Sequence, residues 1–267
     1  MILHNKNAVI YGAGGSLGGA VAIALAAAGA KVFLTGRNIE PVQAVADQII
    51  TAGGSAEVDV VDALDEDAVN NHIQKVAKQY STIDISYNAI GVEAVQNSTL
   101  VDMSIDDFMR PISIGMRSLF LTATAAGRIM IKQKSGVILS LTATPGGIGY
   151  PGTGGFGPTC CAIESLSRNL ASELGVYGVR VVNIRSGGSP DSKVFKEMID
   201  NHPDVMEPVL KNMKGDTMLK RLPLMADIAN TAVFLASDLA GMITGVTVDV
   251  TGGTTAGLNY KVSPLSL

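Results

Sequence analysis

A glycine-rich run near the N-terminus is the first place in the sequence where the backbone could hold a ligand. The pattern Gly-x-x-x-Ser-x-Gly spans residues 12–18, between a short apolar run and an alanine-rich helical pattern. Glycine lets the backbone approach a pyrophosphate, and a helix N-terminus offers free N–H groups to it. The run predicts a dinucleotide site, although a tight turn in an α/β sheet could use the same residues. The binding residues we predict here are Gly12, Gly14, Ser16, Leu17 and Gly18.

Arg37 is a second residue with binding chemistry, because it follows the next apolar run, residues 31–35. Dinucleotide sites for NAD commonly place a carboxylate at this point, where it binds the ribose 2′-hydroxyl. An arginine can pair instead with a 2′-phosphate. Arg37 therefore favours NADP(H) as the cofactor, and the alternative is an ordinary solvated surface cation.

Both features need a scaffold of alternating strands and helices. Short apolar runs alternate with longer helical patterns along the chain, as is typical of a parallel sheet with helices on both faces. The predicted strands are residues 8–11, 31–35, 56–60, 83–88, 136–142, 179–184 and 247–250. We expect a Rossmann-type doubly wound α/β fold with a seven-stranded parallel sheet, in one domain over residues 1–267, with a lid-like segment of short helices at about 186–222.

Composition excludes several other classes of protein. Of the 267 residues 47% are hydrophobic, and the chain has only two cysteines and three scattered histidines, so we predict neither a disulfide framework nor a metal site. A net charge of −4 gives no basic field for nucleic acid or an anionic membrane. The uncharged stretch 7–30 is too rich in glycine and alanine for a membrane span. We expect a cytoplasmic protein with a small-molecule substrate and neither a nucleic-acid nor a membrane partner.

Motifs from about residue 5 to about residue 255 resemble those of the short-chain dehydrogenase/reductase family. The run at residues 11–18 is similar to the family's Thr-Gly-x-x-x-Gly-x-Gly motif, with Tyr11 and Ser16 as departures. Residues 181–187 resemble its Val-Asn-x-Ile-x-Pro-Gly strand and turn, with Ser186 in place of the proline. The resemblance implies further cofactor-binding residues, which are Asp59 and Val60 beside the adenine ring, Asn88, Ala89 and Ile90 after the fourth strand, and Ser186 and Gly187 after the sixth.

The family's catalytic residues are not carried over with these motifs. Its Ser, Tyr and Lys are matched here by Ala143, Phe156 and Cys160, and its catalytic Asn by Gly115. The earlier Tyr position of the enoyl reductase branch holds Thr153. Phenylalanine cannot donate a proton and alanine cannot hydrogen-bond, so we expect ordinary ketone reduction to be weakened about 10²–10⁴-fold.

Three polar residues near the expected site could take over the handling of protons. They are Thr142 beside the lost Ser position, Tyr150 in the following loop, and Cys160 itself. The alternatives are a hydroxyl bonded to the strand end, a loop anchor, and a small buried thiol. The intervening loop, residues 145–157, is rich in glycine. Either it lets a substrate approach the backbone closely, or it no longer serves catalysis.

The predicted function is that of an NADP(H)-dependent oxidoreductase with a non-standard active site. Its substrate would be a small carbonyl, imine or conjugated alkene, because an iminium is already charged and an alkene can take its proton from water. The alternative is a catalytically inactive NADP(H)-binding protein that acts as a sensor or partner subunit. The family resemblance also implies a homodimer or homotetramer.

Overall fold

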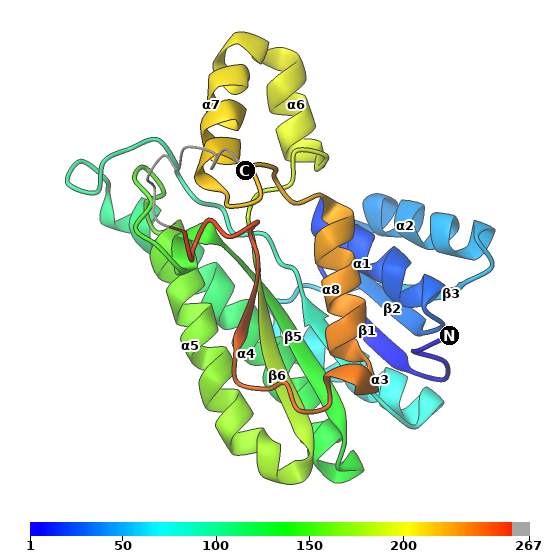
Figure 1. The fold of residues 1–267 in the computed structure, drawn as a ribbon. Helices are drawn as coiled ribbons and strands as arrows, with labels where there is room; N and C mark the ends of the chain where they lie inside the picture. The colour runs from blue at the N-terminus through cyan, green and yellow to red at the C-terminus, as the bar shows by residue number, and fades with distance from the viewer. Residues whose placement is uncertain (258–267) are drawn as a thin grey trace, which may run out of the picture.

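A computed structural model, in which residues 1–257 are described, contains one parallel sheet with helices on both faces (Figure 1). The strand order is β3-β2-β1-β4-β5-β6-β7, and every neighbouring pair is parallel. The strands are β1 (Asn7–Tyr11), β2 (Lys31–Gly36), β3 (Ser55–Val60), β4 (Ile85–Asn88), β5 (Gly136–Ala143), β6 (Val179–Ser186) and β7 (Thr247–Val250). The order reverses direction between β1 and β4, which is where such sheets bind ligands.

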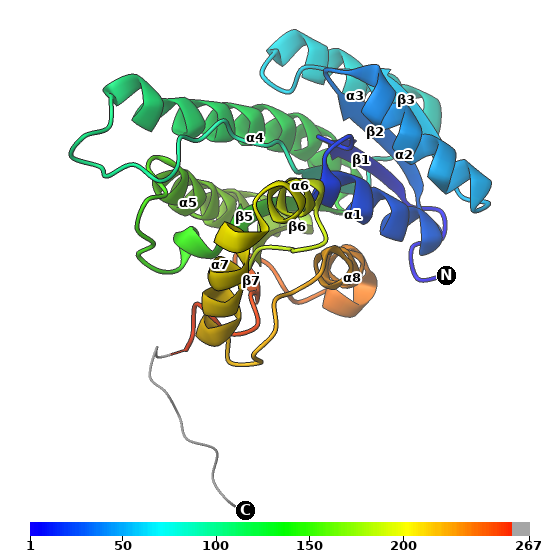
Figure 2. The same ribbon diagram turned by 90° about the horizontal axis from the view of Figure 1, so that it is seen from above.

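Helices cover both faces of the sheet, and Figure 2 shows these two layers from above. The first layer consists of α1 (Ser16–Ala27), α2 (Ile39–Thr51) and α8 (Met225–Ala236). The second consists of α3 (Glu66–Tyr80), α4 (Ile105–Gln133) and α5 (Phe156–Leu174). The helices α6 (Lys193–Asn201) and α7 (Pro203–Asp216) project beyond the carboxyl edge of the sheet, as Figure 1 shows.

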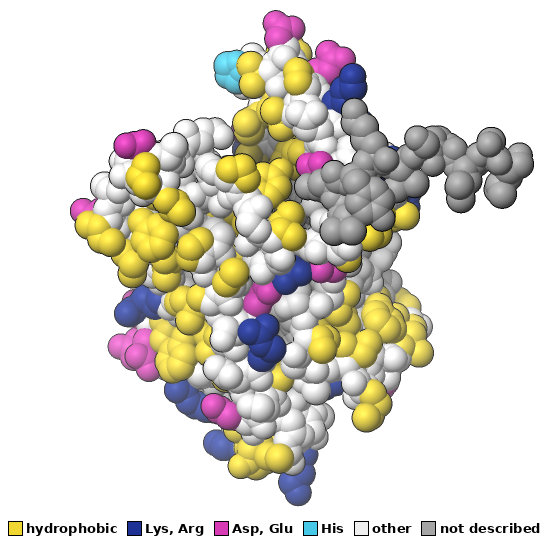
Figure 3. Space-filling view, turned by 60° about the vertical axis from the view of Figure 1, so that its left-hand side comes forward, with side chains coloured by type: hydrophobic (Ala, Val, Ile, Leu, Met, Phe, Trp, Pro, Cys, Tyr) yellow, Lys and Arg dark blue, Asp and Glu magenta, His cyan; other side chains and the backbone are white. Residues whose placement is uncertain are grey.

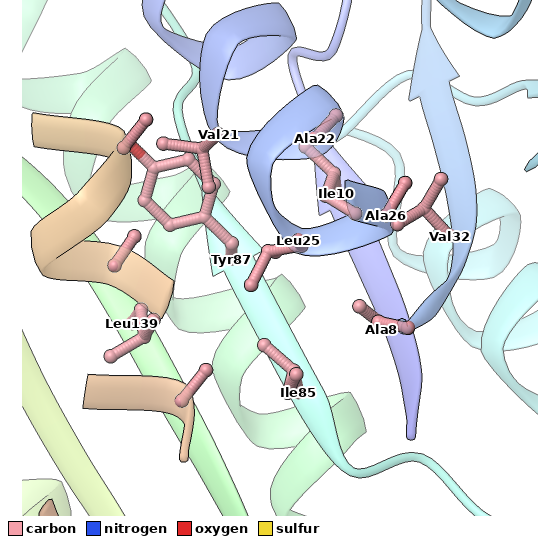
Figure 4. Packing of buried hydrophobic residues seen from close by; sticks show 14 of the residues in the cluster. Ala8, Ile10, Val21, Ala22, Leu25, Ala26, Val32, Ile85, Tyr87 and Leu139 are labelled. Atoms are coloured by element: carbon pink, nitrogen blue, oxygen red, sulfur yellow. The ribbon is translucent and has the colours of Figure 1, made fainter. Parts of the chain in front are cut away.

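Side-chain alternation along the strands divides the core into two layers. In β1, Ile10 packs under α1, whereas Val9 and Tyr11 face the α3 and α4 side. Figure 4 shows how Leu25 of α1 reaches down toward the sheet beside Tyr87 of β4. The alanines and glycines of α1 have small side chains, so this helix packs closely against the neighbouring helices α2 and α8.

The predicted strands agree with the observed ones to within two residues at each end. β5 and β6 each extend one or two residues further, to Ala143 and Ser186, which pair with each other. β4 begins at Ile85 instead of residue 83, because the N–H of Ile83 donates to Gln133 Oε1 (2.9 Å) at the end of α4. The sequence therefore predicted the fold class and strand positions correctly.

The lid-like segment consists of α6 and α7 with their flanking loops. Asp191 accepts hydrogen bonds from the N–H of Met225 (3.0 and 3.1 Å) and so caps α8. Among residues 1–257, no helix has the length and apolar character required to cross a membrane.

Candidate active site

A cleft of about 260 Å³ lies at the carboxyl ends of β1 to β4. We call it the nucleotide cleft. Its walls come from the glycine turn, the end of β2, the turn after β3 and the turn after β4. The lining residues are Gly12, Gly14, Gly15, Gly36, Arg37, Asn38, Pro41, Val61, Asp62, Ala63, Leu64, Ala89, Ile90, Gly91, Glu93 and Ile114.

Two glycines of the turn leave no space for a side chain. Gly12 has φ +80°, and a Cβ atom there would lie 2.7 Å from the carbonyl oxygen of Ala89. A Cβ atom on Gly18 would collide with the carbonyl of Gly12. Gly12, Gly14 and Gly15 line the cleft just before α1 begins, whereas the predicted residues Ser16, Leu17 and Gly18 are not among its lining residues.

Ser16, which departs from the family motif, joins the turn to the lid-like segment. Its Oγ accepts a hydrogen bond from the backbone N–H of Lys193 (3.1 Å), the first residue of α6. The predicted turn residue thus contacts a residue 177 positions later in the chain. No local pattern in the sequence indicated this contact.

Arg37 lines the nucleotide cleft, where the sequence placed it. Its Nη2 lies 4.0 Å from Glu93 Oε1, and both side chains are about two-thirds exposed. An exposed pair at this distance is weak. The guanidinium therefore remains available to a ligand anion, although Glu93 competes for it.

Asp59 and Val60 are not among the lining residues of the cleft. The Asp59 carboxylate accepts two hydrogen bonds from Lys75 Nζ (3.0 Å each) and lies 3.5 Å from His72 Nε2, so it faces α3. β3 ends at Val60, and the chain enters the cleft only afterwards, through Val61, Asp62 and Ala63. The predicted pair therefore lies outside the cleft, and a second acidic residue, Asp62, lines it together with Ala63.

Asn88 shapes the turn after β4. Its Oδ1 accepts from the N–H of Ile90 (3.1 Å), and its Nδ2 donates to Thr122 Oγ1 (2.9 Å) in α4. Both bonds use the amide of Asn88 to hold the backbone in place. Ala89 and Ile90 then form part of the cleft wall.

The end of β5 and the start of α5 carry three of the residues matched to the family's catalytic positions. Ala143 ends β5, Phe156 opens α5, and Cys160 follows one turn later. Burial raises the pKa of the Cys160 thiol to about 11. Such a thiol stays protonated and unreactive at neutral pH.

Thr142 lies under the loop that follows β5, in a buried polar network. Its Oγ1 donates to Glu164 Oε1 (3.0 Å) and accepts from Asn183 Nδ2 (2.7 Å). A threonine hydroxyl has a single hydrogen. Since that hydrogen is already donated to Glu164, Thr142 has none left for a substrate in this arrangement.

A buried charged cluster, which the sequence did not predict, lies beside Thr142. Arg185 of β6 donates to both oxygens of Glu164, from Nε (3.0 Å) and from Nη2 (2.6 Å). Its Nη1 donates to Asp249 Oδ2 of β7 (2.7 Å). A Cβ atom on Gly147 would lie 2.7 Å from Arg185 Nη1, so the loop after β5 rests directly on the cluster. An arginine inside an otherwise apolar strand pattern was the signal for it.

A second cavity, of about 690 Å³, opens beside that loop. We call it the loop cavity. Tyr150 is one of its lining residues and is 38% exposed. The full lining is Thr99, Leu100, Pro145, Gly146, Gly147, Ile148, Gly149, Tyr150, Pro151, Gly152, Thr153, Gly154, Gly157, Pro158 and Cys161. The three proton-donor candidates therefore do not converge, since Thr142 and Cys160 lie buried and Tyr150 faces this cavity.

Ser186 is the last residue of β6, and Gly187 begins the turn after it. The N–H of Gly187 donates to the carbonyl of Val250 (3.1 Å), and a Cβ atom there would lie 2.7 Å from Thr251 Cα. Ser189 follows, with a buried Oγ for which the described residues provide no hydrogen-bond partner. A buried hydroxyl without a partner is costly, which points to a ligand or water at this position.

Comparison with known proteins explains this combination of fold and turns. A family model described as enoyl-(acyl carrier protein) reductase matches residues 12–255. The chain is 31% identical over 255 residues to a 3-oxoacyl-[acyl-carrier-protein] reductase FabG of Chlamydia trachomatis, covering 94% of this chain and 98% of that protein. It is 30% identical over 256 residues to the levodione reductase of Leifsonia aquatica, covering 93% of each.

Solved structures agree with the sequence comparison. A crystal structure of levodione reductase superposes with a TM-score of 0.88 at 26% identity, covering 96% of this chain and 100% of that one. An NAD⁺-bound xylitol dehydrogenase gives 0.88 at 26% identity, with 95% and 100% covered. The chain belongs to the short-chain dehydrogenase/reductase family, and it is an oxidoreductase of that family. These relatives give no support to the alternative of an inactive cofactor-binding protein.

Proposed function

We propose that the protein is an NADP(H)-dependent reductase that transfers hydride to a small carbonyl, imine or conjugated alkene. Arg37 carries the choice of cofactor, because it lines the nucleotide cleft at the end of β2, where an arginine can bind a 2′-phosphate. Gly12, Gly14 and Gly15 line the cleft beside the N-terminus of α1, where a pyrophosphate can bind to backbone N–H groups. When bound, the cofactor supplies the hydride.

The remaining contacts to the cofactor follow from the walls of the cleft. Asp62 and Ala63 take the adenine-binding position that the sequence assigned to Asp59 and Val60. The turn after β4 forms the opposite wall through Ala89 and Ile90. Ser186, Gly187 and the unpartnered hydroxyl of Ser189 are assigned to the end of the cofactor nearest β6.

The handling of protons is assigned to Tyr150. Ala143 and Phe156 carry no proton donor, the thiol of Cys160 is buried, and the hydrogen of Thr142 is donated to Glu164. Tyr150 is the one of the three candidates whose side chain is partly exposed on a cavity wall. A phenol there can protonate a carbonyl oxygen or an enolate as hydride arrives.

The names of the relatives support this range of substrates. Two of them are reductases named for 3-oxoacyl groups and for levodione, and the matching family model is named for enoyl groups. Reduction of a polarised C=O or C=C bond is common to these names. The substrate itself is not specified by them.

Binding and turnover measurements test the proposal. NADPH and NADH binding is measured by fluorescence titration, and oxidation of NADPH is followed with ketones, cyclic imines and enones. We expect Arg37→Ala to weaken NADPH binding about 10–100-fold, the loss of one hydrogen-bonded charge pair, and to leave NADH binding unchanged. Arg128→Ala in α4, whose Nη1 contacts Asn70, is the matched control.

Three results would reject parts of the proposal. An equal loss of NADPH and NADH binding in Arg37→Ala would remove the 2′-phosphate assignment. Tight NADPH binding with no oxidation across all three substrate classes would restore the inactive sensor or partner subunit. A Tyr150→Phe variant that keeps wild-type kcat and its pH profile would exclude the phenol as the donor.

We also propose that the protein forms a homodimer or homotetramer, as the family resemblance implies. Hydrophobic patches lie exposed on the face of the molecule shown in Figure 3. On α4, Phe120 is 51% exposed, whereas Leu119 and Ala123 are buried in the core. Light scattering coupled to gel filtration measures the assembly, and a monomer at micromolar concentration would contradict this expectation.

A further inference from the structure

The loop cavity is lined by apolar and neutral polar residues. Of the described residues that line it, none is an acid, a lysine, an arginine or a histidine. Leu100, Ile148 and prolines supply apolar surface, and within this lining the ionisable side chains are Tyr150 and Cys161. Pockets of this size bury most of a small ligand and orient it with a few polar groups.

The cavity lies between two segments that are tied together. The loop after β5 and the segment after β4 meet where the N–H of Asn97 donates to the carbonyl of Gly152 (2.7 Å). A Cβ atom on Gly154 would lie 2.5 Å from Met103 Cε, so the contact is tight. Both segments leave the carboxyl ends of neighbouring strands, which is where a parallel sheet binds its ligands.

The charged cluster beside the loop contains one arginine and two carboxylates, which pair with one another. Arg185 donates hydrogen bonds from Nε and Nη2 to Glu164 and from Nη1 to Asp249. The backbone of Gly147 packs directly against its guanidinium. Its guanidinium is therefore committed to two carboxylates and does not form part of the cavity wall. A substrate carboxylate or phosphate in the cavity would lose its hydration without gaining an ionic partner, at a large cost in free energy.

We infer that the body of the substrate, bound in the loop cavity, is uncharged and apolar, such as a ring or a short hydrocarbon chain attached to the reducible group. This inference deepens the proposed function and rests on it. Tyr150 on the wall would meet the reducible group, and the glycines of the loop would allow close packing on its body.

Cys161 offers a readout that does not depend on turnover. It is the exposed cysteine of the pair and lines the cavity, whereas Cys160 is buried. Iodoacetamide labelling of the full-length protein saturated with NADP⁺ is followed by mass spectrometry, with Cys161→Ser as the labelling control. We expect acetophenone to slow labelling of Cys161 at least fivefold at saturation and its carboxylated analogue, 4-acetylbenzoate, to leave the rate unchanged. Equal protection by both, or protection by the carboxylate alone, would overturn the inference.

A charge placed in the cavity gives a second test. A Cβ atom added to Gly149 would meet no other atom within 4 Å, and this residue has no left-handed φ, so Gly149→Asp fits without strain. It should weaken protection by acetophenone at least tenfold. Gly175→Asp at the end of α5, where a Cβ also meets nothing within 4 Å, is the matched control and should behave as wild type. Wild-type protection in Gly149→Asp would refute cavity binding.

Turnover measured on the same samples distinguishes a failure of the proposed function from a failure of the inference about the loop cavity. Protection of Cys161 by acetophenone without oxidation of NADPH by any substrate class would reject the proposed function and keep the binding of an apolar body. NADPH oxidation by neutral ketones without protection would keep the function and reject the loop cavity as the substrate pocket.

Discussion

Replacing Arg185 with methionine removes the centre of the buried charged cluster and leaves two carboxylates behind. The side chain of Glu164 is 6% exposed and that of Arg185 12%, whereas Asp249 is 35% exposed. In Arg185→Met the buried Glu164 carboxylate keeps only the hydroxyl of Thr142 as a donor among the described residues. Breaking a buried pair in this way costs about 3–5 kcal/mol, because an uncompensated charge stays buried.

Substitutions at the three residues of the cluster should lower the free energy of unfolding by different amounts. Asp249→Asn removes the more exposed partner and should cost about 1 kcal/mol or less, as exposed pairs do. Glu164→Gln leaves Arg185 paired with Asp249. It should therefore cost less than Arg185→Met. The double variant Glu164→Met with Arg185→Met removes both buried charges and should be markedly more stable than Arg185→Met alone.

Urea unfolding followed by circular dichroism measures these free energies, with the slope m as a check that the unfolded state has not changed. A loss of about 3–5 kcal/mol would lower Tm by about 6–20 °C in a domain of this size. If Arg185→Met costs less than about 1 kcal/mol, the cluster is not buried in solution. If the free-energy costs of Glu164→Met and Arg185→Met add up in the double variant, the two charges do not stabilise each other as proposed.

Three further predictions concern the cleft and the helix beside it. Glu93→Gln should tighten NADPH binding several-fold by removing the anion that competes for Arg37, and fluorescence titration that shows weaker binding would contradict the geometry. Gly18→Ala should weaken binding of both cofactors at least tenfold, because the new methyl group collides with the carbonyl of Gly12, and isothermal calorimetry measures this. Burial lowers the pKa of His72 below its usual value despite the nearby Asp59 carboxylate, so the unfolded state binds the extra proton and stability should fall as pH drops below about 6.5. In His72→Phe this fall in stability between pH 7 and 5 should shrink, and urea titrations at the two pH values that show an unchanged difference would rule out His72 as its source.

The strands could be predicted from sequence because each is a short apolar run ended by glycine or by polar residues. The glycine turn and Arg37 were found for the same reason, since both follow directly after a strand. Local spacing of this kind is preserved on folding. Which acidic residue lines the cleft could not be predicted, because acidic residues occur at both 59 and 62 and only the end of β3 decides between them.

The charged cluster and the loop cavity depend on contacts between distant segments. Glu164 and Arg185 are 21 residues apart, and Arg185 and Asp249 are 64 apart, so no helical or strand period connects them. Ala143, Phe156 and Cys160 were recognised as departures only through a family pattern. The sequence alone could not show which of the remaining polar side chains faces a cavity. The fold buries Thr142 and leaves Tyr150 partly exposed.

The hydrogen bond between Ser16 and Lys193 links the start of α1 to the start of α6. A neutral hydrogen bond of this kind contributes about 0.5–1.5 kcal/mol to holding α6 against the turn. It also brings the positive ends of two helix dipoles to one hydroxyl, so that an anion arriving at the turn is attracted by both helices at once. The proposed phosphate site and the start of α6 therefore share one residue, at a position where the family motif has glycine.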